Sequence, residues 1–153
     1  MKSEALSHDS FLIERVYPNC RDHVWSAWAD PDKKRAWFGD GLTEIDFREG
    51  GVQRGSFKNH MGDHSNETTF FEIADRERIV FAYSMAMNGV IHSVSLVTVV
   101  FEDQGGGTLL RYFEQMCIIP PSDGIDGRRH GWQALLDSLE RFLTNDPRTR
   151  EAG

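Results

Sequence analysis

Near its end the chain carries the stretch RRHGWQALLDSLERFLT, residues 128–144, and this stretch decides the fold. Its apolar residues recur at i, i+3, i+4 and i+7, and they fill an arc of roughly 120° on a helical wheel, as expected for a helix face that packs on a core. These residues are Trp132, Leu135, Leu136, Leu139, Phe142 and Leu143. The pattern predicts one amphipathic helix that closes the chain.

The sequence before this helix indicates an antiparallel sheet. Turn signals such as Asn88-Gly89 and the glycines of 104–107 separate short runs typical of strands. Strands that follow one another through tight turns form a meander. The predicted strands are Phe11–Tyr17 and then residues 43–48, 52–58, 67–74, 78–87, 93–103 and 108–118.

Two short helices are predicted between the first strand and the rest. Asn19 is a candidate N-cap for the first helix, whose apolar stripe would be Cys20, Val24, Ala27 and Trp28. Asp30-Pro31 predicts the start of the second helix, because aspartate caps a helix and proline suits its first position. The predicted order is therefore β-α-α-β6-α, an α+β fold.

The chain of 153 residues is predicted to form one domain over residues 11–146, with a flexible leader at 1–10 and a flexible tail at 147–153. Its net charge of −7 gives no basic surface for nucleic acid. No apolar run approaches the ~20 residues of a membrane span, so membrane insertion is not expected. Two cysteines make no disulfide framework, and a cytoplasmic location is expected.

Alternation along three strands predicts which side chains face the closing helix. Most are apolar, but a tyrosine, a serine and one carboxylate lie among them, and burying unpaired polar groups costs about 1–3 kcal/mol each. The predicted inward residues are Ile79, Phe81, Tyr83, Met85, Ser95, Val97, Val99, Phe101, Leu110, Tyr112, Glu114 and Met116. The other face of the last strand is also half apolar, so the register that places Glu114 inside stays open.

Glu114 is the candidate acid, base or ligand contact, because burial would raise the pKa of its carboxyl. Arg128 lies on the apolar side of the closing helix, one turn before Trp132. A pair between Glu114 and Arg128 is therefore a hypothesis, against the alternative that Glu114 pairs elsewhere or faces solvent. The predicted ligand-binding residues are Tyr83, Met85, Tyr112, Glu114, Met116, Arg128, Trp132 and Leu136.

Two histidines suggest a metal site only weakly. His60 and His64 lie in a predicted hairpin loop over Asn59 to Asn66, where, unlike in a helix, their i, i+4 spacing does not ensure that the imidazoles share a face. Zinc requires three or four ligands, and no third is evident. Neither a metal nor a cofactor is expected.

Several motifs together resemble the bacterial relatives of the activator of Hsp90 ATPase, in the START-like (SRPBCC, Bet v 1-like) superfamily. The similarity runs from about Phe11 to Leu143. It is carried by the segments 15–31 and 36–39, Gly50-Gly51, residues 78–81 and 106–110, Glu114-Gln115, Gly131-Trp132 and residues 135–139. The resemblance implies a helix-grip fold, a curved sheet wrapped around the long helix over a cavity. At Gly55 and Ser56 the chain lacks the aromatic residues usual in the family, which would widen the cavity or mark a bulge.

Three functions follow from these observations. The first is a non-enzymatic protein that binds a hydrophobic or amphipathic small molecule in the cavity. The second is an enzyme of cyclase or hydrolase type that uses Glu114 as acid or base. The third, implied by the resemblance alone, is a partner of an Hsp90-type chaperone. Exposed edge strands would also permit a homodimer.

Overall fold

The structure is a computed structural model and describes residues 5–39, 41–122 and 124–145. Over these residues the chain forms seven strands and three helices in the predicted order β-α-α-β6-α. Their bounds are β1 Ser7–Tyr17, α1 Arg21–Ala29, α2 Pro31–Phe38, β2 Leu42–Ile45, β3 Val52–Asn59, β4 Gly62–Ala74, β5 Arg78–Met87, β6 Val90–Gln104, β7 Gly107–Ile118 and α3 Gly124–Thr144.

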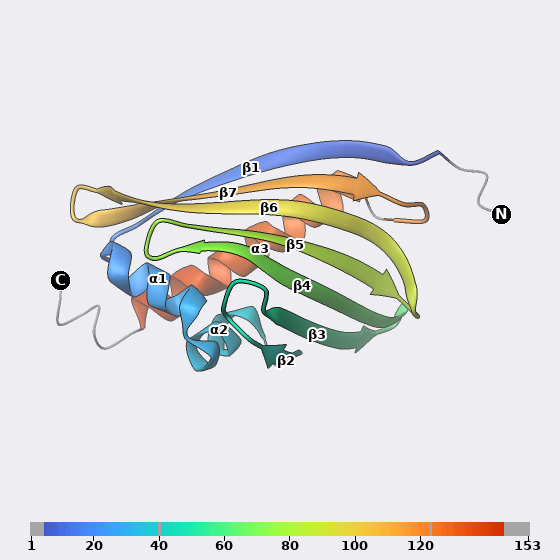
Figure 1. Cartoon of the computed structure of the whole chain (residues 1–153), viewed down its shortest axis with the longest axis horizontal. Helices are drawn as coiled ribbons and strands as arrows, with labels where there is room; N and C mark the ends of the chain where they lie inside the picture. Colours follow the sequence, from blue (N-terminus) through green and yellow to red (C-terminus); the bar gives the residue numbers. More distant parts are fainter. Residues whose placement is uncertain (1–4, 40, 123, 146–153) are drawn as a thin grey trace.

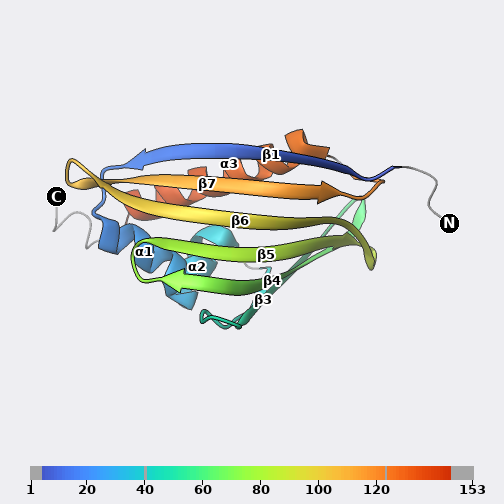
Figure 2. The same ribbon diagram turned by 45° about the horizontal axis from the view of Figure 1, so that its top comes forward.

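The strands form a single antiparallel sheet in the order β1-β7-β6-β5-β4-β3-β2. The long helix α3 crosses one face of the curved sheet, with α1 and α2 beside one end of it (Figure 1). Figure 2 shows the strands side by side and the helices gathered on the same face. The predicted helix-grip α+β fold is therefore confirmed.

The concave face of the sheet and α3 share the core. The helix buries Trp132, Leu136, Leu139 and Leu143, whereas Leu135 and Phe142 of the predicted stripe are only partly buried. The predicted inward residues of β5, β6 and β7 are all buried except Met85, which is half-buried. The register that places Glu114 inside is thus the correct one.

The capping prediction for α1 was wrong. Cys20 is the N-cap and makes no side-chain cap, so it precedes the helix, and Trp25 joins Val24, Ala27 and Trp28 among the buried residues. The Asn19 side chain instead donates to the Leu143 carbonyl at 3.2 Å and joins α1 to the end of α3. The prediction for α2 was correct, since Asp30 accepts from the N–H groups of Asp32 and Lys33.

Three boundaries differ from the prediction by four residues or more. β1 begins at Ser7, inside the predicted leader, because its polar start pairs with β7 up to Ile118. The predicted loop 59–66 is mostly strand, since β4 begins at Gly62 and hydrogen-bonds to β3 and β5 on both sides. α3 begins at Gly124, one turn before the predicted start at Arg128. The predicted tail at 147–153 lies outside the described residues.

Candidate functional site

A row of polar side chains crosses the concave face beneath the helices. Gln53 of β3 pairs with Thr68 of β4, Thr68 with Tyr83 of β5, and Tyr83 with Ser95 of β6. Directly paired residues on neighbouring strands point to the same face, so these four side chains lie next to one another. All four are buried. We call them the interior polar row.

Glu114 of β7 lies at one end of this row and is fully buried. Its carboxylate accepts hydrogen bonds from the Tyr83 hydroxyl at 2.9 and 2.8 Å, from Ser95 Oγ at 2.6 Å and from the Tyr112 hydroxyl at 2.6 Å. Three neutral donors from three strands therefore hold it in place.

Arg128 brings a guanidinium to the same carboxylate from α3. Its Nη1 lies 3.0 Å from Glu114 Oε2 and also donates to the Tyr83 hydroxyl at 3.0 Å, while its Nη2 donates to Ser93 Oγ at 2.5 Å. Only 6% of Arg128 is exposed. The Glu114–Arg128 pair predicted as a hypothesis is thus formed inside the protein.

The buried pair shapes the titration of its neighbours. Burial, and then the adjacent Glu114 carboxylate, raise the pKa of Tyr83 far above its ordinary value. Burial likewise raises the pKa of Tyr112. For Arg128, burial acts to lower the pKa, but Tyr83 and Glu114 outweigh it and the pKa is raised. The tyrosines therefore stay neutral donors, and Arg128 stays charged.

An aromatic wall built by the helices covers the polar row. Trp132 donates from Nε1 to the Tyr83 hydroxyl at 3.2 Å, and its ring lies 4.1 Å from that of Tyr112. The same indole stacks on Trp28 of α1 at 6.2 Å and meets Phe38 of α2 at 6.0 Å. Such offset and edge contacts are the preferred geometries of aromatic pairs.

Lys34 of α2 lies at the other end of the polar row, and the sequence analysis missed it. Its Nζ donates to Gln53 Oε1 at 2.9 Å, and only 3% of the residue is exposed. Burial lowers the pKa of its amine to about 7. The run Lys33-Lys34-Arg35 suggests a solvated helix face, but Lys34 precedes Trp37 and Phe38 by three and four residues. That spacing puts it on the apolar face and was the available signal.

The structure places the remaining predicted ligand-binding residues around the row. Leu136 and Met116 are buried, and Met116 is the register partner of Ser95. Met85 is half-buried opposite Ser93. Together with the residues already described, all eight lie on the concave face or on the inner side of α3.

Gly55 does not leave an opening in the sheet. A Cβ there would lie 3.1 Å from the Asn66 side chain and 3.3 Å from the Gly41 carbonyl, because β2 and its preceding turn approach closely. Ser56 is exposed, and its N–H donates to the Gly41 carbonyl. Small residues at Gly55 and Ser56 therefore leave room for β2 and the turn before it, which form the edge of the sheet.

The two histidines of the β3–β4 hairpin lie outside the interior. His64 Nε2 is 2.9 Å from Asn59 Oδ1, and its ring stacks on Phe57 at 4.5 Å. Within residues 5–39, 41–122 and 124–145, no group of three or more His, Cys, Asp or Glu could hold a metal ion. No helix in that part of the chain is long and apolar enough to cross a membrane.

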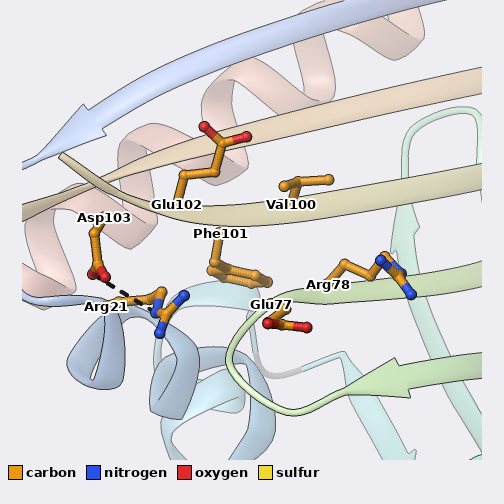
Figure 3. Close-up of a pocket in the computed structure, with 7 residues that line it drawn as sticks. All are labelled: Arg21, Glu77, Arg78, Val100, Phe101, Glu102 and Asp103. Carbon is orange, nitrogen blue, oxygen red and sulfur yellow. Dashed lines mark ion pairs between the residues drawn. The ribbon is translucent and has the colours of Figure 1, made fainter.

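A surface groove of about 400 Å³ lies where β6 and the β4–β5 turn meet the start of α1 (Figure 3). Arg21 and Asp103 face each other across it at 3.7 Å. It is lined by Arg21, Glu77, Arg78, Val100, Phe101, Glu102 and Asp103. Its two cations and three carboxylates are mixed, so the groove does not select one charge, and the interior polar row is the stronger candidate.

Solved structures with the same fold include close relatives of this chain. The Mll3558 protein from Rhizobium loti is 35% identical with a TM-score of 0.86, over 91% of this chain and 99% of that chain. A protein from Rhizobium leguminosarum is 32% identical with a TM-score of 0.88, over 93% and 98%. DynU16, from the dynemicin biosynthetic locus, is 22% identical with a TM-score of 0.71, over 90% and 48%, and shows the fold alone. The comparison with curated proteins gave no match.

The family comparison agrees with the resemblance noted in the sequence. The model for "Activator of Hsp90 ATPase homolog 1-like protein" matches residues 20–144. This span contains α1, α2, the strands of the polar row and α3, so it includes every residue of the interior site. The chain therefore belongs to the family of activator of Hsp90 ATPase homolog 1-like proteins, with the SRPBCC fold.

Proposed function

We propose that this protein binds a small amphipathic molecule between the concave face of the sheet and helix α3. The observation that carries the proposal is the interior polar row, which lies beneath an aromatic wall of Trp28, Phe38 and Trp132. The row offers polar contacts, and the wall offers apolar surface. Binding sites for small molecules combine these two elements.

The polar row is costly for a core that serves packing alone. Buried polar side chains lose their contacts with water, and each must recover them inside the protein. The same interior also contains two buried cations, Lys34 and Arg128. A ligand could offset this cost. Burying about 250 Å² of its apolar surface would contribute about 6 kcal/mol before the entropy of binding is subtracted.

Met85 and Phe38 mark where a ligand would enter. Both are partly buried hydrophobic residues that pack against the core. Methionine adapts its shape at little cost, which suits a side chain that must move when a ligand enters. Tyr83 would then orient the polar part of the ligand, since its hydroxyl lies between Glu114, Arg128 and Trp132.

The geometry does not favour Glu114 as a catalytic acid or base. Its two oxygens already accept from Tyr83, Tyr112, Ser95 and Arg128. A general base must reach the proton that it removes, and here the protein's own donors occupy that space. Glu114 is therefore proposed as a positioning residue that fixes Tyr83 and Arg128. The family's relation to Hsp90 co-chaperones gives no contact in this chain from which to argue a partner.

Two experiments test the proposal. Native mass spectrometry of gently purified protein, compared with its denatured mass, should reveal a small molecule released on denaturation. Titration with the neutral fluorescent probe N-phenyl-1-naphthylamine should show saturable binding to the folded protein. Met85→Arg should abolish probe binding, because it places a charge at the half-buried entrance.

Leu96→Arg is the matched control, since Leu96 is 43% exposed on the opposite face of the same sheet. It should leave probe binding intact. Folded wild-type protein that neither releases a molecule nor binds the probe would refute the proposal. So would equal loss of binding in the two variants, because the site would then not lie on the concave face.

A further inference from the structure

The environment of Lys34 differs from that of the other buried cation. Three aromatic rings surround its Nζ, those of Trp28 at 5.4 Å and of Phe38 and Phe70 at 5.5 Å each. Within residues 5–39, 41–122 and 124–145, its one hydrogen-bond acceptor is the neutral amide of Gln53. No carboxylate among the described residues pairs with it. Arg128, in contrast, is neutralised by Glu114.

The hydrogen-bonding capacity of Lys34 is only partly used. An ammonium group carries three N–H donors, and Gln53 accepts from one of them. The others face rings, which attract a cation but do not neutralise its charge. A buried charge without a counter-ion is energetically costly, so an anion from outside the chain would stabilise the Lys34 ammonium.

Trp28 supplies an independent observation. Only 1% of the residue is exposed, and its indole Nε1 is buried without a hydrogen-bond acceptor within residues 5–39, 41–122 and 124–145. An indole N–H can only donate, and a buried tryptophan usually finds a partner. The Trp28 ring is one of the three that surround Lys34. The same part of the interior therefore contains two donor groups with unsatisfied hydrogen-bonding capacity, the charged Lys34 ammonium and the Trp28 indole N–H.

We propose that Lys34, Trp28 and Gln53 form a receptor for the carboxylate of the bound molecule, so that the ligand is an amphipathic carboxylic acid. This inference rests on the proposed function and adds the chemical class of the ligand. A carboxylate has two oxygens and can accept from both Lys34 and Trp28. Such a charge-assisted bond is about twice as strong as a neutral one, and stronger still where water is excluded.

The surroundings favour an anion over other polar groups. An amine would meet the Lys34 ammonium with the same charge, and an alcohol would leave that charge uncompensated. The apolar part of the acid would lie along the aromatic wall, since the Trp28 ring also stacks on Trp132. The carboxylate and the Glu114–Arg128 pair would then lie at opposite ends of the interior polar row.

The proposed receptor gives binding a defined dependence on pH. The groups that face Lys34 Nζ are the rings of Trp28 from α1, Phe38 from α2 and Phe70 from β4, and the amide of Gln53 from β3, none of which titrates. In the protein without ligand, the Lys34 amine has a pKa of about 7, and a bound carboxylate would raise this pKa. Binding above pH 7 then takes up a proton, so the affinity falls by up to about tenfold per pH unit.

The experiment compares three probes with the same twelve-carbon chain, dodecanoate, dodecanol and dodecylamine, by isothermal titration below the micelle concentrations of the two charged probes and within the solubility of dodecanol. At pH 6.5 the wild-type protein should bind dodecanoate about tenfold or more tightly than dodecanol, and dodecylamine most weakly. Lys34→Met should bring the affinities for dodecanoate and dodecanol together and leave that for dodecanol nearly unchanged.

Lys58→Met is the matched control, because the Lys58 side chain is 84% exposed on β3. It should keep the preference for dodecanoate. Trp28→Phe keeps a ring but removes the indole donor, so it should lower the affinity for dodecanoate several-fold more than the affinity for dodecanol. This variant tests the receptor even if Lys34→Met fails to fold. Equal wild-type affinities for dodecanoate and dodecanol, or a preference that survives Lys34→Met, would overturn the receptor alone. If none of the three probes binds, the receptor is overturned, and the proposed function fails with it when the protein also releases no molecule and does not bind N-phenyl-1-naphthylamine.

Discussion

Replacing Lys34 by methionine should make the protein more stable at neutral pH. Methionine has a length similar to that of the lysine stem and suits the surrounding rings of Trp28, Phe38 and Phe70. The change removes a buried charge that no carboxylate of the described residues balances. Most substitutions in a core destabilise, so a gain here would be informative.

The size of the gain follows from the pKa of Lys34, which is about 7 in the folded protein against 10.5 when unperturbed. Between these values the unfolded chain binds more protons than the folded chain, so the free energy of unfolding rises with pH. The cost of burying the charge is about 4 kcal/mol at pH 7 and about 2 kcal/mol at pH 9. Losing the bond to Gln53 costs about 1–3 kcal/mol, which leaves a net gain of about 1–3 kcal/mol at pH 7.

The assay is urea unfolding followed by tryptophan fluorescence from pH 6 to pH 9.5, for the wild type, Lys34→Met and Lys58→Met. The difference between Lys34→Met and the wild type should shrink by about 2 kcal/mol from pH 7 to pH 9, because the wild type gains stability as Lys34 loses its proton. Lys58→Met should follow the wild type. If Lys34→Met is destabilised at every pH by a constant amount, Lys34 is not an uncompensated buried charge and the reasoning is refuted.

Three further predictions concern stability, each measured by urea unfolding. Glu114→Gln should cost about 3–5 kcal/mol, because it leaves the Arg128 guanidinium buried without a carboxylate, and Arg128→Met added to it should recover part of that loss rather than add to it. Trp132→Ala should cost about 3–5 kcal/mol. Trp132→Phe should cost clearly less, since the phenyl ring keeps most of the stacking on Tyr112 and loses only the hydrogen bond to Tyr83. Equal costs for the two variants would mean that Trp132 stabilises the protein through its N–H and not through stacking. Gly131→Ala should stabilise the protein by about 0.5–1 kcal/mol, because Gly131 lies in helix α3 and a Cβ there would have no atom to clash with within 4 Å. Gly107→Ala should destabilise it, because the added Cβ would lie 2.4 Å from the Tyr17 carbonyl oxygen.

The sheet and the closing helix could be predicted from the sequence because their signals are periodic. Alternation along β5, β6 and β7 identified the inward face, including Glu114, and the helical spacing of Trp132, Leu136, Leu139 and Leu143 identified the buried side of α3. Boundaries were less predictable where the strand is polar. The segment Gly62–Asn66 carries turn-type residues, but hydrogen bonds to strands on both sides keep it extended.

The candidate site could be predicted only in part, because its ends come from different elements. Glu114 and Arg128 were found because each breaks an apolar pattern on a long, regular element. Lys34 breaks such a pattern too, but α2 has only eight residues and three consecutive basic residues, so its short apolar face was obscured. The contact with Gln53 also depends on how α2 packs on β3, which no local pattern determines.

The two buried cations mark different roles for the two ends of the interior. Arg128 has a carboxylate and three hydroxyl oxygens from the sheet within hydrogen-bond reach, so the protein itself supplies what this charge needs. In the part of the chain that the structure describes, Lys34 has one neutral acceptor and three rings, although the same interior holds a carboxylate that pairs with the other cation. A fold that satisfies one buried cation completely and leaves the second uncompensated gives up stability at that point. Sites that bind ligands are where such a cost is commonly found, because the missing interaction comes from the ligand. By this argument, Glu114 and Arg128 form the fixed end of the site, and Lys34 forms the end that a ligand completes.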